Sequence, residues 1–332
     1  MSEEAPSLLP AESLRTSIAA QSLQADPSPP ATYTLNPGLG IGFAAMGVVV
    51  LCWSGFNIVS RIGGKSVLTP YDLAALRFLV AAILLSPMFF KSLGMPGLTI
   101  WRRVALASCA GLGYALLVYM GFSLAPAAHA GVLVNGGIPL ATTMIGWWVF
   151  GLKPTHRAWI ALAITGAGIA LIGRHSLISE NVSLTLLGDL FYFLAACSWG
   201  FYGQLVRRWQ VNPLAASANI NMISLLIFAP IYLLFLPKGI ADATSAQIML
   251  QAGYQGVVAG VIAASCYAFA TLRIGPTRAS LMLALVPPIS AIAAVPFLGE
   301  ALTIETALGA ALVTIGAVFG ASGGLGIRHT KS

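Results

Sequence analysis

The stretches WSGFNIVSR, residues 53–61, and WGFYGQLVR, residues 199–207, share a tryptophan and, eight residues later, an arginine. The residue midway between them is small or polar, Asn57 in the first stretch and Gly203 in the second. The second stretch follows the first at an offset of 146 residues. Other residues recur at offsets of 143 to 150: Pro70 and Pro87 as Pro213 and Pro230, and Ala125-Pro126 as Gly275-Pro276. Such similar offsets over so long a distance indicate that the chain is a duplication.

The composition predicts an integral membrane protein. Of its 332 residues, 58% are apolar and only 8% are charged, and the mean hydropathy is +0.86. About a quarter of the residues are charged in soluble domains. A helix needs roughly 20 mostly apolar residues to cross a bilayer, and lipid offers its backbone no other hydrogen-bond partner. We predict ten such helices: 39–59, 70–90, 103–124, 127–149, 157–173, 186–206, 213–236, 249–272, 278–298 and 303–322.

The two ends of the chain differ from this apolar body. Residues 1–38 carry acidic residues, serines and prolines, which bury too little apolar surface to fold. We predict a disordered cytoplasmic tail there, and no signal peptide, because no apolar stretch follows a basic start. Residues 39–173 and 186–322 are then the first and second five-helix repeats, and residues 323–332 form a second cytoplasmic tail.

Lysine and arginine predict the orientation. With a cytoplasmic amino terminus, the inner segments hold twelve of these residues and the outer segments four: Arg61, Lys65, Arg174 and Lys238. This bias predicts a protein of the cell inner membrane with both termini in the cytoplasm. Five helices per half make the repeats inverted, which suits alternating access. The bias also explains the net charge of +7, and scattered basic residues form no groove for a nucleic acid.

Six short stretches carry a resemblance to a known family. They are Cys52-Trp53-Ser54-Gly55-Phe56-Asn57, Leu73-Ala74-Ala75-Leu76-Arg77-Phe78, Gly188-Asp189-Leu190-Phe191, Ser198-Trp199-Gly200, Tyr254-Gln255-Gly256 and Leu298-Gly299-Glu300-Ala301-Leu302-Thr303. In this order and spacing, over about residues 40 to 322, the chain resembles EamA-type transporters of the drug/metabolite transporter superfamily. The resemblance implies a duplicated five-helix unit and a secondary transporter that exports small polar metabolites or amino acids.

The chain departs from this family pattern at one point. The family usually repeats its Leu-Gly-Glu in the first half, whereas this sequence has Phe150-Gly151-Leu152-Lys153 there. Glu300 therefore has no acidic counterpart in the first repeat.

Arg77 is the charged residue predicted to lie deepest in the membrane. It falls seven residues into the second span, roughly 10 Å below the outer surface at 1.5 Å per residue. A charge there costs a few kcal/mol unless it is paired or hydrated. We expect its guanidinium to face the bundle and to bind an anionic group of a solute. A structural role, snorkelling outward or pairing with Asp72, is the alternative. Its repeat mate is Ile220.

Prolines near the middle of two spans mark the expected site. Span four contains Asn135-Gly136-Gly137-Ile138-Pro139 and span nine Val286-Pro287-Pro288. A proline opens the helical hydrogen-bond ladder, so matched broken helices predict a solute site, unless the prolines merely shape the bundle. Besides Arg77, we predict a lining of Trp53, Asn57, Tyr114, Asn135, Pro139, Trp199, Tyr202, Asn221, Gln255, Tyr267 and Pro288. Any one of these could instead join neighbouring helices.

Two acids are candidates for coupling transport to protons. Asp189 opens the sixth predicted span and Glu300 closes the ninth, both on the outer side. Near a boundary, each could instead simply be hydrated. Glycines in spans five and ten predict close helix contacts, either within the chain or in a homodimer.

Other chemistries find little support. The four cysteines include no Cys-x-x-Cys pair and the four histidines are scattered, so no metal or other cofactor is predicted. No Walker loop suggests direct use of ATP. An intramembrane enzyme would need a nucleophile with its base, and Ser108, Ser198 and Ser265 have no such partner at readable spacing. A scaffold that transports nothing is a third possibility, favoured if Arg77, Asn135 and Tyr114 face lipid.

Overall fold

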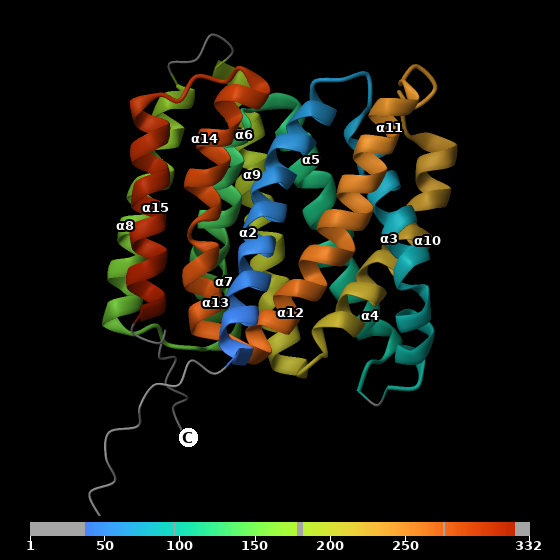
Figure 1. Ribbon diagram of the computed structural model, residues 1–332, viewed down its shortest axis with the longest axis horizontal. Coiled ribbons are helices and arrows are strands. Elements are labelled where there is room, and N and C mark those ends of the chain that lie inside the picture. Colours follow the sequence, from blue (N-terminus) through green and yellow to red (C-terminus); the bar gives the residue numbers. More distant parts are fainter. Residues whose placement is uncertain (1–36, 96, 178–181, 275, 323–332) are drawn as a thin grey trace, which may run out of the picture. The chain divides into compact units, whose positions relative to one another are not determined.

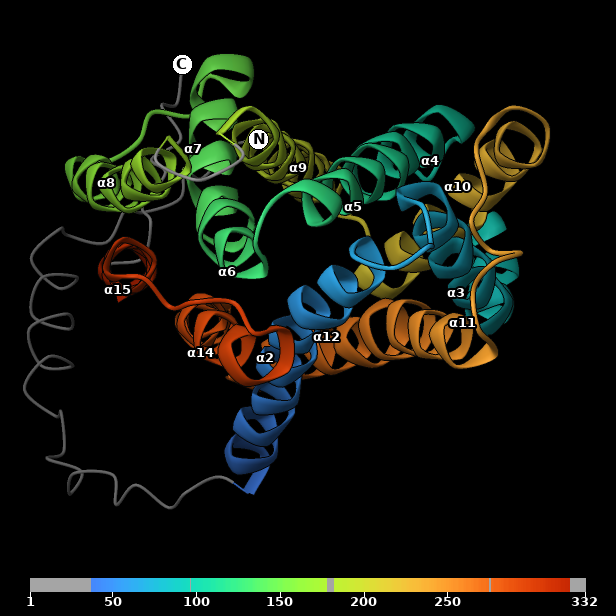
Figure 2. The same cartoon turned by 90° about the horizontal axis from the view of Figure 1, so that it is seen from above.

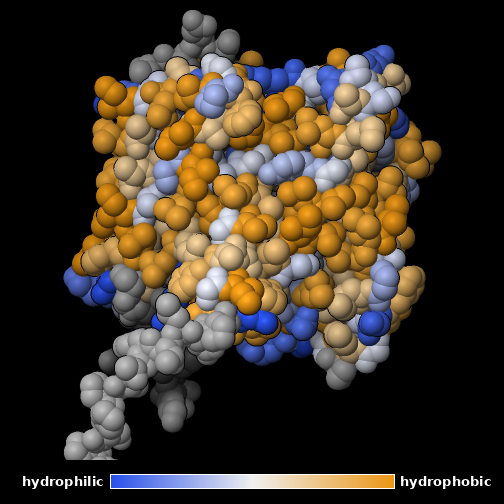
Figure 3. All heavy atoms as spheres, in the orientation of Figure 1, coloured by the Kyte–Doolittle hydropathy of each residue, from blue (hydrophilic) through white to orange (hydrophobic). Residues whose placement is uncertain are grey.

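The computed structural model describes residues 37–95, 97–177, 182–274 and 276–322, which are helical apart from their connections (Figure 1). The predicted tails, 1–38 and 323–332, lie almost entirely outside these residues. Ten helical segments are long and apolar enough to cross a membrane. Apolar residues cover most of the face drawn in Figure 3, and polar residues gather at its upper and lower margins. The prediction of an all-helical membrane protein with ten spans is confirmed.

The first five spans are α2 (Pro37–Gly64), α3 (Pro70–Leu93), α4 (Ile100–Leu106) with η1 (Ala107–Gly113) and α5 (Tyr114–Leu124), α6 (Ala127–Ala130) with η2 (Gly131–Gly136) and α7 (Gly137–Phe150), and α8 (His156–Ser176). The second five are α9 (Val182–Trp209), α10 (Pro213–Phe235), α11 (Ser245–Gln251) with η3 (Ala252–Ile262) and α12 (Ala263–Ile274), α13 (Pro276–Leu283) with α14 (Val286–Leu298), and α15 (Ile304–Ser322). The segments η1, η2 and η3 are π-helical. We call the side where α2 begins and α15 ends the terminal face, and the opposite side the far face.

Local sequence signals start the second helix of each repeat. Thr69 caps α3 and forms a capping box with Asp72, and the Asn212 side chain accepts the amides of Leu214 and Ala215 at the start of α10. Each helix has a proline, Pro70 or Pro213, in its first turn. The amides of the first turn have no partner within the helix, so the missing N–H of a proline costs no hydrogen bond there. Pro70 and Pro213 thus mark equivalent helix starts on opposite faces.

The two proline-bearing spans differ from one another. Span nine is interrupted, because α13 ends at Leu283 and α14 begins at Val286, with Pro287 and Pro288 in its first turn. Span four continues through Pro139, and the helix widens to the π-helical η2 just before it. A proline disturbs the backbone hydrogen bonds of a helix, and a π-helical turn accommodates this disturbance so that the helix continues. The expectation of matched broken helices is therefore wrong for the first repeat.

Repeat mates pack against each other at two places. The second helices of the two repeats, α3 and α10, are in contact, and so are the last helices, α8 and α15 (Figure 2). Gly168 and Gly309 allow the α8–α15 contact, because a Cβ at either would lie within 3.0 Å of the other's carbonyl oxygen. Gly168 of α8 and Gly309 and Gly316 of α15 thus lie in a seam within one chain, so these three glycines are not available as a dimer face.

The seam predicts a contrast between two glycines of α8. Gly168→Ala should lower the midpoint of thermal unfolding. The free energy of unfolding should fall by about 1–3 kcal/mol, as is typical where a substitution overpacks a close contact. Gly166→Ala is the matched control, because a Cβ at Gly166 meets nothing within 4 Å. Thermal unfolding of the purified protein in detergent measures both. Equal midpoints for the two variants would contradict the close seam.

Candidate functional site

Arg77 lies inside the bundle, on α3 and between aromatic rings of two other helices. Its guanidinium carbon is 5.7 Å from the ring centre of Phe56 on α2 and 5.8 Å from that of Tyr114 on α5. These are distances at which a cation is attracted to a ring face. Within the part of the chain that the structure describes, no carboxylate lies within 4.0 Å of its nitrogens.

Asp72 does not pair with Arg77. Its carboxylate accepts hydrogen bonds from the amides of Thr69 and Gly239, at 2.7 and 2.9 Å, and from the hydroxyl of Tyr232. The carboxylate therefore joins the start of α3 to the end of α10 and the connection that follows it. The alternative in which Asp72 neutralises Arg77 is wrong, because the lone pairs of Asp72 are used at the far face.

The predicted aromatic residues form two groups. Trp199 of α9 lies between Tyr114 and Tyr202, with ring centres 4.7 and 5.2 Å away. Its repeat mate Trp53 stacks on Tyr267 of α12 at 5.7 Å. The two tryptophans thus occupy similar settings in the two repeats, and Tyr114 links the group around Trp199 to Arg77.

Three of the predicted polar residues form hydrogen bonds within the protein, either to a neighbouring helix or to their own helix. Asn57 donates to the hydroxyl of Ser290 on α14 at 2.9 Å, and Gln255, fully buried, donates to Ser60 on α2 at 3.0 Å. Asn221 donates to a carbonyl of its own helix, and its Oδ1 is buried without a hydrogen-bond partner among the described residues. For Asn57 and Gln255, these bonds match the helix-joining role that the sequence left open.

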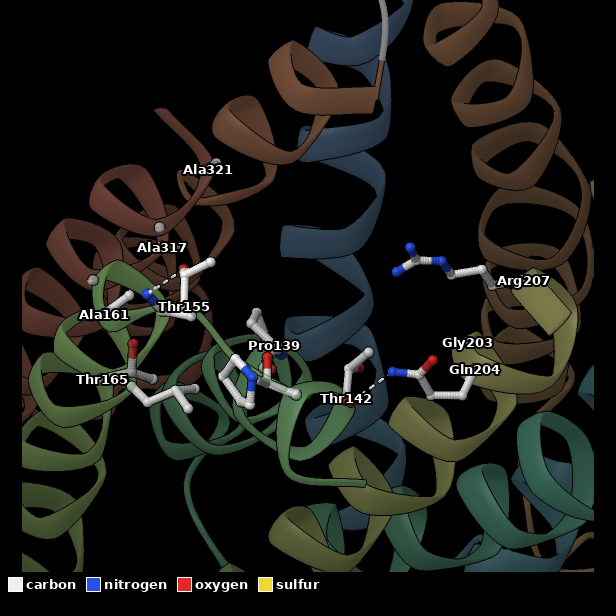
Figure 4. A pocket seen from close by; sticks show the side chains of 16 residues that line it. Pro139, Thr142, Thr155, Ala161, Thr165, Gly203, Gln204, Arg207, Ala317 and Ala321 are labelled. Carbon is white, nitrogen blue, oxygen red and sulfur yellow. Dashed lines mark hydrogen bonds between the residues drawn. The ribbon is translucent and has the colours of Figure 1, made fainter. Parts of the chain in front are cut away.

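A cavity of about 340 Å³ lies between α7, α8, α9 and α15 toward the terminal face (Figure 4). Its walls are mainly small residues and threonines. They also include Gln204 and Arg207 of α9 and the predicted Pro139 of α7. A second cavity of about 410 Å³ shares Gln204 and Arg207 and reaches Leu152. Both volumes fall within the range that holds small organic molecules.

Apart from Pro139, the cavity residues were not predicted from the sequence as part of the site. Arg207 belongs to the duplicated motif, but it was interpreted only as a charge that orients the protein. Its repetition of Arg61 was the signal available. No pattern distinguished Thr142 or Gln204, which line the cavity because four helices separated in sequence meet there. Asn135 and Pro288 are partly exposed and do not line either cavity.

The two repeats are joined at the far face by a buried ion pair. Arg61 Nε lies 3.0 Å from Glu300 Oε1, and the two side chains are only 12% and 11% exposed. Arg61 also donates to the carbonyl of Phe122 at 2.6 Å, while the amide of Ala127 donates to Glu300 at 2.9 Å. Lys65 approaches Glu300 at 3.7 Å from a more exposed position. This cluster connects α2, α5 and α6 to the connection between α14 and α15.

The location of these charges corrects two expectations. The first span was predicted to end at residue 59, which placed Arg61 in a loop, whereas α2 continues to Gly64 and carries Arg61 in its last turns. Glu300 was allowed to be merely hydrated, yet it is paired and mostly buried. The extra turns of α2 bring the guanidinium beside the end of α14.

Asp189 is also held away from water. It lies two turns into α9 rather than opening it, and its carboxylate is 2.9 Å from Nδ1 of His129 on α6. The hydroxyl of Ser176 on α8 donates to its other oxygen. Asp189 is 7% exposed and His129 1%. The alternative of a simply hydrated Asp189 is therefore wrong.

A third buried charge was missed. Arg103 is 4% exposed and donates to the carbonyls of Leu98 and Ser92 and to the side chain of Asn219 on α10. It fixes the turn before α4 and joins it to α3 and α10 near the terminal face. In the sequence analysis Arg103 opens the third predicted span and counts only among the twelve basic residues of the inner segments.

A duplicated unit of five membrane-spanning helices, with a cation and aromatic rings inside the bundle, defines a multi-pass membrane protein with an architecture typical of secondary transporters. The sequence pattern of the EamA-like transporter family matches residues 40–174 and 186–321, once for each repeat. The chain belongs to the EamA-like transporter family.

Relatives of similar length support this assignment. The chain is 26% identical over 281 residues to the uncharacterized transporter YwfM of Bacillus subtilis, covering 81% of this chain and 90% of that protein. It is 25% identical over 241 residues to the uncharacterized inner membrane transporter YedA of Escherichia coli K12, covering 72% and 76%. A solved crystal structure matches with a TM-score of 0.55 at 21% identity, over 85% of this chain and 95% of the other, and supports the fold alone.

The buried ion pair at the far face predicts a coupling between Arg61 and Glu300. Glu300→Leu should lower stability by about 3–5 kcal/mol, because it leaves the Arg61 cation buried and unpaired. The double variant Arg61→Met/Glu300→Leu should recover a large part of this loss. Thermal unfolding in detergent measures the coupling.

Lys65→Met serves as the control for this pair, because the Lys65 side chain is 45% exposed and exposed pairs contribute at most about 1 kcal/mol. A double variant as unstable as the sum of its two single variants would show that Arg61 and Glu300 do not interact.

Proposed function

We propose that the protein is a secondary active transporter that exports small polar metabolites or amino acids across the cell inner membrane by alternating access. The observation that carries this proposal is the guanidinium of Arg77, placed inside the bundle between Phe56 and Tyr114 without an acidic partner among the described residues. A cation at that depth costs free energy unless it is paired or hydrated. Its presence there without an acidic partner therefore indicates a functional role.

The surroundings of Arg77 suit an anionic or zwitterionic solute. A guanidinium binds a carboxylate through two parallel hydrogen bonds, so Arg77 would hold the anionic end. The faces of Tyr114 and Trp199, whose ring centres are 4.7 Å apart, would contact an ammonium group or an apolar side chain of the solute. We expect Trp53 and Tyr267 to line the same path from the second repeat.

The contacts at the two faces are consistent with one state of an alternating-access cycle. The far face is held by the ion pair between Arg61 and Glu300, whereas both cavities lie toward the terminal face. We assign the terminal face to the cytoplasm from the lysine and arginine bias. In this assignment the solute enters from the cytoplasm while the outer side is closed.

Glu300 and Asp189 are the proposed coupling residues. Each carboxylate holds a contact near the far face that would change when this face opens: Glu300 with Arg61 and Asp189 with His129. A proton on Glu300 would remove its charge and weaken its attraction to Arg61. Proton entry from outside would thereby favour opening toward the outside. Export down the solute's own gradient is the alternative, and it predicts no loss of flux in Glu300→Gln.

Arg77→Gln should reduce the export of anionic and zwitterionic solutes at least tenfold, because the interaction of a charged pair is lost. The exported solutes are first identified by comparing metabolites inside and outside a deletion strain and an overexpressing strain. Initial efflux rates in cells with equal amounts of membrane-inserted protein then measure the effect.

Arg102→Gln is the matched control, because Arg102 is a partly exposed arginine at the terminal face that donates to the carbonyl of Gly97 and lies outside the proposed site. It should export at the rate of the unaltered protein. Unchanged efflux in Arg77→Gln would remove Arg77 from the proposed site.

A further inference from the structure

The helices α7 and α14 end in the same backbone motif on opposite faces. Gly151 and Gly299 have left-handed φ angles of 68° and 65°, which glycine adopts without strain. Their amides bond to the carbonyl four residues back. The next amides, of Leu152 and Glu300, bond to the carbonyl six residues back at 2.9 and 3.3 Å. The glycine bond is that of the αL helix cap, and the second bond is the same in both helices, so Leu152 and Glu300 occupy equivalent positions after it.

The arginine that faces this position is also repeated. At the far face, Arg61 of α2 pairs with Glu300. Its repeat mate Arg207 of α9 lies at the terminal face, where it lines the cavity of about 410 Å³ together with Leu152. Within the described ranges, no carboxylate lies within 4.0 Å of Arg207. The same frame thus holds an ion pair at one face, and an arginine, a leucine and a cavity at the other.

The charge around this cavity has one sign. Arg208 lines it as well, with its guanidinium carbon 5.5 Å from the ring centre of Phe150, and Lys153 follows Leu152 in the chain. The acids that the structure describes are Asp72, Asp189, Asp242, Glu300 and Glu305, and all five belong to the far-face ends of their helices or to far-face connections. The charged side chains that line this pocket, Arg207 and Arg208, are both cations, and such a pocket raises the local concentration of anions.

We propose that the cavity of about 410 Å³ at the terminal face binds the carboxylate or phosphate group of a small anion on Arg207. This group would take the position that the Glu300 carboxylate has at the far face. Gln204, whose amide nitrogen donates to the carbonyl of Thr142 at 2.7 Å, borders both cavities and fixes the wall beside Arg207 (Figure 4). The interpretation of this site as the entrance for the transported solute rests on the proposed function, whereas anion binding itself requires no flux.

The bound anion would do at the terminal face what Glu300 does at the far face. Glu300 joins α2 to the connection between α14 and α15 through Arg61. An anion on Arg207 would join α9 to the connection between α7 and α8. Closure of the terminal face would then depend on the ligand, because the chain itself supplies no acid at position 152.

Protection of a cysteine in the cavity tests the binding site. In a variant with Cys52, Cys109, Cys197 and Cys266 replaced by serine, Thr142→Cys places one thiol in the wall of the adjoining cavity of about 340 Å³, which shares Gln204 and Arg207 with the proposed site. Its labelling by a thiol reagent is followed in nanodiscs of phosphatidylcholine. Inorganic phosphate or lactate should slow labelling several-fold, and uncharged glycerol should not. Arg207→Gln should abolish this protection, and Arg273→Gln, at the same face but outside both cavities, should retain it.

An internal carboxylate provides an independent measurement. Leu152→Glu should slow labelling without added anions and remove their effect, because the new carboxylate pairs with Arg207; Leu152→Gln should do neither. Nanodiscs that contain phosphatidylglycerol separate the possible sources of the anion. Arg207-dependent slowing by this lipid alone would assign the site to a lipid headgroup, and slowing by phosphate or lactate assigns it to a soluble anion.

Equal labelling rates with and without every anion would overturn the proposal, as would protection that persists in Arg207→Gln. These measurements are independent of transport. Protection without export by the overexpressing strain would retain the anion site and reject the proposed transport function.

Discussion

A bilayer interior gives polar groups no partner outside the protein, and this constraint accounts for the arrangement of charges in the bundle. Arg61 is paired with Glu300, Asp189 contacts His129, and Arg103 is surrounded by carbonyl and amide oxygens. Each of these buried charges is satisfied by another helix, so each also fixes how two helices lie. Arg77, which is partly exposed, is the exception, because aromatic rings are its neighbours and no acid pairs with it among the described residues. A site for an anionic solute group is the simplest reason for keeping it there.

Duplication repeats the frame of the molecule but not its chemistry. Equivalent helices start with Pro70 and Pro213, and equivalent helices end at Gly151 and Gly299. Side chains are free to differ on this common frame, since backbone hydrogen bonds and glycine contacts hold it. Arg77 has Ile220 as its mate and Glu300 has Leu152. The two faces therefore carry different contacts: an ion pair within the chain at the far face, and at the terminal face an arginine with no acidic side chain within 4.0 Å among the described residues.

The sequence predicted those properties that depend on composition and period. Ten apolar segments and two repeats follow from solvent and length alone, and they are confirmed. A helix end is less certain, and placing the end of α2 at residue 59 instead of Gly64 moved Arg61 from the bundle to a loop. The roles of Asn57 and Gln255 could not be predicted, because an amide in a membrane helix suits a solute or a neighbouring serine equally well. The cavity beside Gln204 and Arg207 depends on four helices meeting, which no single segment records.

The interaction at each face also bears on when the protein can change state. At the far face both charges belong to the chain, so in the proposed cycle this face would close whether or not a solute is present. At the terminal face Arg207 has no acidic side chain within 4.0 Å among the described residues, and in the same proposal a mobile anion would supply the charge. An empty transporter would then remain open toward the terminal face, and only a loaded one would gain the interaction that closes it. A ligand shifts such an equilibrium by its difference in affinity for the two states, and a single charged contact made in only one of them supplies that difference.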